Sequence, residues 1–200
     1  MINAVISAAI QVGAVLVIAA MIYALFGKRS GFRHYIGLTP TTAIAAGAAI
    51  LWGIAPVLVL VGFPGIRAMA GGDHSAVGVV AGSGLTPAIA ATLAIKALLQ
   101  TSLSEELLFR GLIGKRLIGR FGFAIGNGMQ AVAFGLVHLS LLAIPQASLP
   151  LVLAMVAFTG VMGWVNGWLN ERLGNGSIVP GWIAHGLTNL LSYLAAAYFG

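Results

Sequence analysis

Cysteine is absent from this 200-residue sequence, and acidic residues are scarce, with only four Asp and Glu. Without cysteine the chain can form no disulfide, no thiolate nucleophile and no Cys-ligated zinc site. Charged residues make up only 7% of the chain, against about 25% in soluble globular domains. Because 60% of the residues are hydrophobic and the mean hydropathy is +1.02, the composition predicts an integral membrane protein.

The apolar residues form long segments, which predict an all-α fold. A polytopic transmembrane helix bundle of about six membrane-spanning helices is expected, because backbone polar groups in lipid must be satisfied within each segment. We expect one structural unit: residues 1–85 supply two N-terminal transmembrane helices and an external loop at 64–85, and residues 86–199 form a core of four helices. The predicted segments are 2–26, 41–63, 86–108, 125–144, 149–169 and 178–199.

The positions of the basic residues predict the orientation. All but two of the ten Lys and Arg lie in the connections 27–40, 109–124 and 170–177. The positive-inside rule places these connections in the cytoplasm, so we predict a multi-pass protein of the cell membrane with both termini outside the cytoplasm. Because these basic residues flank apolar segments, the net charge of +6 does not predict nucleic-acid binding. Lys96 lies inside a segment, where it either snorkels or faces the bundle interior.

Two adjacent glutamates stand out in the stretch SLSEELLFRG. Ionisable side chains within membrane segments are costly, and they therefore mark candidate functional sites. On an α-helix Glu106 and Arg110 share a face, while Glu105 is rotated by about 100° from Glu106. The spacing predicts a bridged carboxylate at Glu106 and a free one at Glu105. An interfacial helix end with a salt bridge explains the same residues.

Two histidines lie in later segments, in AFGLVHLS and WIAHGLTN. With a turn near Phe121, antiparallel helices would hold Glu105 and His138 side by side, and His185 would reach a comparable depth. Asn189 follows His185 by one helical turn and shares its face. A carboxylate with an imidazole can activate water, and an imidazole with a carboxamide can stabilise an oxyanion, so the set suits amide hydrolysis. A packing role for each histidine stays open.

The residues of other intramembrane protease chemistries are missing. An aspartyl dyad needs two aspartates, but Asp73 is the only one, and neither H-E-x-x-H nor G-x-S-x-G occurs. The stretches EELLFR, FGLVH and HGLTN occur in that order and fit the patterns EExxxR, FxxxH and HxxxN. In these motifs residues 86–199 resemble the CPBP (Abi) family of intramembrane proteases, which is related to the CAAX prenyl endopeptidases.

The resemblance implies an intramembrane endopeptidase that hydrolyses a peptide bond of a membrane-associated protein or peptide. It implies that Glu105 and His138 activate water and that His185 and Asn189 stabilise the oxyanion. The implied partners are the lipid bilayer and a peptide or protein substrate, and a lipidated substrate stays open. The residues that the resemblance assigns to structural support of the site are Glu106, Arg110 and Phe134.

Three questions stay open at this stage. The family is often classed as metalloendopeptidases, so zinc held by His138, His185 and Glu105 is an alternative to a metal-independent mechanism. A non-catalytic member of the fold could act in bacteriocin self-immunity or as a membrane scaffold for a partner protein. A proton-coupled transporter that uses Glu105 and Lys96 is disfavoured, because no internal repeat is evident.

Overall fold

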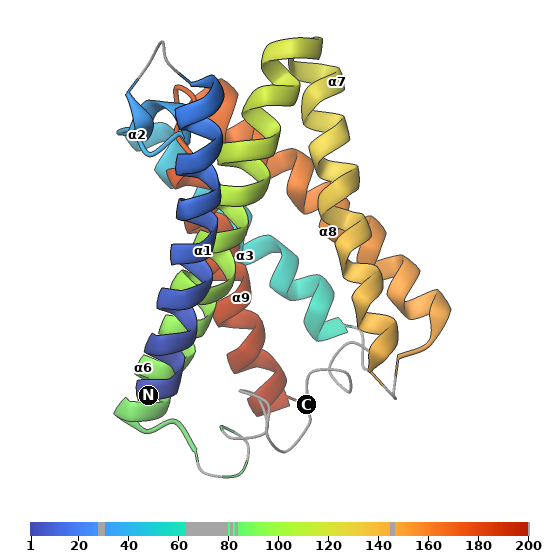
Figure 1. Ribbon diagram of the computed structural model, residues 1–200. Helices are drawn as coiled ribbons and strands as arrows, with labels where there is room; N and C mark the ends of the chain where they lie inside the picture. Colours follow the sequence, from blue (N-terminus) through green and yellow to red (C-terminus); the bar gives the residue numbers. More distant parts are fainter. Residues whose placement is uncertain (28–30, 63–79, 81, 83, 145–146, 200) are drawn as a thin grey trace.

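The computed structural model describes residues 1–27, 31–62, 80, 82, 84–144 and 147–199, and all regular elements in these ranges are helical (Figure 1). The predicted all-α class is confirmed. Most of the expected external loop at 64–85, with Arg67, lies outside the described residues, as do Lys28 and Arg29. The helices are α1 (Ile2–Phe26), α2 (Phe32–Tyr35), α3 (Ala43–Gly62), α6 (Pro87–Ala94), η1 (Ile95–Leu103), η2 (Glu106–Gly114), α7 (Lys115–Leu136), η3 (Val137–Ala143), α8 (Leu149–Trp168), η4 (Leu169–Leu173) and α9 (Val179–Phe199).

The chain is a multi-pass membrane protein by the length and composition of its helices. Among the described residues, three helical stretches are long and apolar enough to cross a membrane: Ile2–Phe26, Pro87–Ala143 and Leu149–Leu173. A shorter apolar helix covers Ala43–Leu58. The total of about six spans and the orientation of the chain stay predictions.

The stretch Pro87–Ala143 reverses direction inside α7. Gly122 has φ 78° and ψ 167°, a conformation that residues with a Cβ rarely adopt. In Figure 1 the green limb before Gly122 rises, and the yellow limb after it descends beside α8. The two limbs meet closely, since a Cβ at Gly126 would collide with the backbone of Ile118. The turn that the sequence predicts near Phe121 is therefore present at the next residue.

Small residues bring the later helices close together. At the contact between α7 and α8, a Cβ on Gly167 would collide with the Asn127 side chain. At the contact between α3 and α9, a Cβ on Gly53 would lie 2.7 Å from the Ala184 carbonyl oxygen. The Thr188 hydroxyl donates a hydrogen bond to the Gly53 carbonyl oxygen at 2.9 Å. Such close approach is typical of helix packing in membranes, and here it packs α9 tightly against α3.

Candidate active site

Glu105 and Glu106 lie at the junction of two consecutive π-helical segments, η1 and η2. A π-helix pairs residues five positions apart, so some carbonyl oxygens lose their α-helical partners. Side chains bind several of these oxygens: the Ser104 hydroxyl donates to Thr101 O at 3.0 Å, Trp182 Nε1 donates to Leu98 O at 2.6 Å, and Arg116 Nη1 donates to Gly111 O at 2.6 Å. Two local hydrogen bonds and one tertiary hydrogen bond, from Trp182, thus satisfy carbonyl oxygens of the π-helical segments, which often occur at functional sites.

Glu106 is the centre of a buried polar cluster. Its side chain has no exposed surface, and that of Arg110 is 2% exposed. Glu106 Oε1 lies 3.2 Å from Arg110 Nη1 and accepts hydrogen bonds from His185 Nδ1 at 3.2 Å and Asn166 Nδ2 at 3.3 Å. The Arg110 guanidinium also lies over the Phe134 ring, 4.1 Å from its centroid. Glu106 therefore joins η2, α8 and α9 through one carboxylate oxygen.

His185 lies between the two glutamates. Its Nδ1 faces Glu106, and its Nε2 is 3.7 Å from Glu105 Oε2. The Glu105 side chain is 27% exposed, in contrast to the fully buried Glu106. The adjacent carboxylates thus differ as the helical spacing predicts: Glu106 is bridged and enclosed, while Glu105 is accessible.

A cavity of about 140 Å³ adjoins this cluster, and His138 and His185 both line it. His138 Nδ1 is 2.8 Å from the Phe134 carbonyl oxygen, which can only accept, so Nδ1 carries the proton and Nε2 is left without one in the neutral ring. The Phe134 ring contacts the ring of His138 and that of His185 edge to face, at centroid distances of 5.2 and 5.7 Å. Asn189 Nδ2 donates to Ser102 Oγ at 3.1 Å. The full lining is Phe134, His138, Met155, Phe158, Thr159, Met162, Asn166, His185, Thr188, Asn189, Ser192 and Tyr193.

The structure brings most of the sequence-predicted residues to one place. His138, His185, Asn189 and Phe134 line the cavity, and Glu105 contacts His185. In the described part of the chain, no hydrogen bond or ion pair joins Glu105 to His138. Within the same residues, no group of three His, Cys, Asp or Glu side chains is arranged to hold a metal ion, and zinc held by His138, His185 and Glu105 stays a prediction.

Sequence reasoning missed two residues of the cluster, Asn166 and Ser102. Both are buried, with exposures of 1% and 0%. Asn166 lies in the stretch GWVNG, whose two glycines pack closely against α7. The available signal was its amide in an otherwise apolar segment, because such a group must find a polar partner inside the bundle.

Comparison with known proteins gives a family match. Residues 86–191, just over half of the chain, match the family model described as Type II CAAX prenyl endopeptidase Rce1-like. Searches among curated proteins and solved structures found no match. The matched region contains the glutamates, Arg110, both histidines and Asn189.

Proposed function

The chain belongs to the Rce1-like family of type II CAAX prenyl endopeptidases, and on that premise we propose that it is an intramembrane endopeptidase. It hydrolyses a peptide bond of a membrane-associated protein or peptide. The observation that carries this proposal is the position of His185 between an enclosed and an accessible carboxylate, beside a cavity that also contains His138. In a scaffold protein the same side chains would serve only folding or contact with a partner.

In the proposed mechanism, Glu105 and His138 activate a water molecule. The Glu105 carboxylate takes one proton from the water while the oxygen attacks the scissile carbonyl carbon. His138 orients this water through Nε2, which is an acceptor because Nδ1 donates to the Phe134 carbonyl. Collapse of the tetrahedral intermediate breaks the carbon–nitrogen bond, and Glu105 returns its proton to the leaving amine. Every step uses side chains of the described site and no metal.

His185 and Asn189 stabilise the oxyanion of the intermediate. With both ring nitrogens protonated, His185 keeps Nδ1–H on Glu106 and can donate Nε2–H to the oxyanion. The Asn189 amide donates one hydrogen to Ser102, which leaves its second hydrogen for the substrate. Glu106, held by Arg110 and Asn166, is thereby a positioning residue that fixes the ring of His185.

The experiment measures the incorporation of oxygen from water into the cleaved products. The protein, reconstituted in vesicles, is incubated in ¹⁸O-labelled water with membrane peptides from a strain that lacks it, and with one synthetic peptide in farnesylated and unmodified forms. Mass spectrometry should find products with one ¹⁸O in the new carboxyl group, and Glu105→Gln should reduce their formation by about 10²–10⁴-fold. Glu171→Gln is the matched control, because Glu171 pairs with Lys115 outside the cavity and should be dispensable for hydrolysis.

The alternative, a non-catalytic scaffold or immunity protein, makes a different prediction. It expects no labelled product from the parent protein and no difference between Glu105→Gln and Glu171→Gln. Equal product from the parent and Glu105→Gln would also contradict the assigned role of Glu105, even if hydrolysis occurs.

A further inference from the structure

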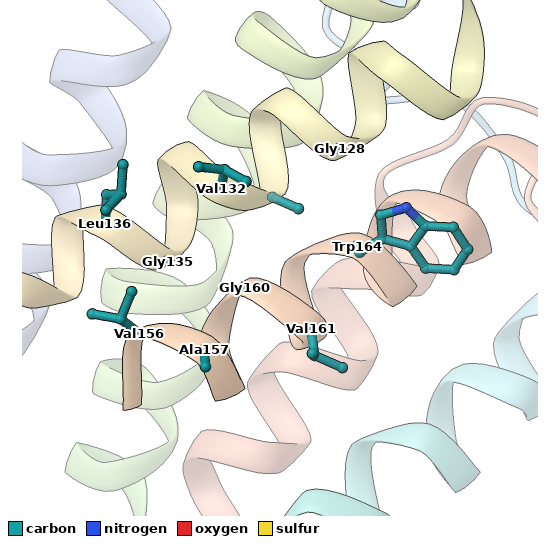
Figure 2. Close-up of a pocket in the computed structure, with 10 residues that line it drawn as sticks. Gly128, Val132, Gly135, Leu136, Val156, Ala157, Gly160, Val161 and Trp164 are labelled. Atoms are coloured by element: carbon teal, nitrogen blue, oxygen red, sulfur yellow. The ribbon is translucent and has the colours of Figure 1, made fainter. Parts of the chain in front are cut away.

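A second hollow lies between α7 and α8 (Figure 2). None of the residues that line it lines the cavity beside His185. Its volume is about 450 Å³, larger than that of the cavity beside His185. The two helices touch at its floor, where a Cβ on Gly135 would lie 2.6 Å from the Val156 carbonyl oxygen. The lining is Gly128, Ala131, Val132, Gly135, Leu136, Val156, Ala157, Gly160, Val161 and Trp164.

This groove is apolar and open to the surroundings. Val132, Leu136 and Val161 are each at least half exposed, which is costly in water but suits contact with hydrocarbon. The lined part of α7, residues 128–136, is about 12 Å long at 1.5 Å per residue. These dimensions suit a flexible hydrocarbon chain lying along the two helices.

Near one end of the groove lie two arginines, Arg172 and Arg120, that carry positive charge. Trp164, at this end, packs edge to face against Phe123 with ring centroids 6.2 Å apart, and the Arg172 guanidinium lies 4.3 Å from the Phe123 centroid. Arg120 lies at the same turn, over the Phe121 ring at 5.6 Å. Both arginines are exposed, and among the described residues neither forms an ion pair with an acid.

We propose that the α7–α8 groove, with Arg172 at its end, binds an anionic phospholipid. An acyl chain lies in the groove, and the phosphate accepts hydrogen bonds from Arg172. Stacking on Phe123 covers the face of the guanidinium and leaves its in-plane N–H donors free, which is the edge that binds phosphate. Trp164 stands between the apolar and the charged part, as expected for an indole at the membrane interface. This site is independent of the proposed peptidase activity.

Charge complementarity decides the choice of occupant. The cytoplasmic leaflet is rich in anionic lipids, and the basic connections, including Arg172, are predicted to face it. A zwitterionic lipid would fill the groove equally well but gain less from Arg172. A second copy of this chain would place like charges together at the same end.

The test measures lipid retained by the purified protein in detergent. Phosphatidylglycerol and phosphatidylcholine of equal chain length are titrated separately, and native mass spectrometry counts the bound molecules. The parent should retain phosphatidylglycerol at least about fivefold more tightly than phosphatidylcholine, and Arg172→Gln should remove this preference. Arg33→Gln, which removes another exposed arginine on α2, should preserve it.

A second variant tests the groove without relying on charge. Gly128 lines the groove and has open space where a Cβ would stand. Gly128→Leu should therefore fill the groove and weaken the binding of both phosphatidylglycerol and phosphatidylcholine. Gly47→Leu is the matched control, because Gly47 also has open space but lies on α3. The proposal is overturned if phosphatidylcholine binds as tightly as phosphatidylglycerol, or if Arg33→Gln acts like Arg172→Gln. Displacement of phosphatidylglycerol by a farnesylated peptide, or a dimer lost in Gly128→Leu, would also overturn it by identifying another occupant.

Discussion

Replacement of Glu106 by Gln should destabilise the protein strongly. The substitution keeps the size of the side chain but removes the negative charge that Arg110, His185 and Asn166 contact. Since Arg110 is almost completely buried, it would become an uncompensated charge, which typically costs about 3–5 kcal/mol. Thermal unfolding in detergent and an SDS–urea titration measure the loss. We expect a large drop in the free energy of unfolding and in the amount of folded protein.

Two controls isolate the cause. Glu171→Gln breaks the Lys115–Glu171 pair, whose side chains are 17% and 23% exposed, and Lys115 keeps its bond to the Gly176 carbonyl oxygen. Its cost should be about 1 kcal/mol or less. Adding Arg110→Met to Glu106→Gln removes the stranded charge and should restore at least about 1 kcal/mol. The reasoning is refuted if Glu106→Gln costs no more than Glu171→Gln, or if the double variant is less stable than Glu106→Gln alone.

Three further predictions concern other parts of the molecule. Gly167→Ala should cost about 1–3 kcal/mol through collision with Asn127, whereas Gly47→Ala should leave the melting temperature nearly unchanged; equal melting temperatures would contradict the close α7–α8 contact. Asn189→Ala should lower kcat by about 10²–10³-fold with little change in KM. The oxyanion role would be contradicted if the parent protein contained stoichiometric zinc and His185→Ala lost it. A reporter fused after Gly200 should be found outside the cytoplasm, and a cytoplasmic signal would reverse the predicted orientation.

Helix positions were predictable because apolar runs in a membrane protein leave few alternatives. The first predicted segment, 2–26, coincides with α1, and the segment 149–169 differs from α8 by one residue. The turn between the third and fourth segments was placed within one residue of Gly122. The pairing of Glu106 with Arg110 followed from their i,i+4 spacing.

The arrangement around His185 was not predictable in the same way. The structure places Glu105 next to His185 and fixes His138 by the Phe134 carbonyl oxygen, two contacts that the sequence did not indicate. The π-helical segments on either side of Glu105 depend on tertiary hydrogen bonds such as Trp182 to Leu98, which no local pattern encodes. Depth along ideal helices predicts which residues share a layer of the bundle, but not which side chains touch within it.

The central claim is that Glu105 acts in catalysis and Glu106 positions His185. The most direct test compares turnover per folded molecule for the parent, Glu105→Gln and Glu106→Gln, reconstituted in the same vesicles with one cleaved peptide. The account predicts that Glu105→Gln folds like the parent and turns over about 10²–10⁴-fold more slowly, while Glu106→Gln loses most of its folded protein. A fully active Glu105→Gln, together with a well-folded but inactive Glu106→Gln, would contradict it.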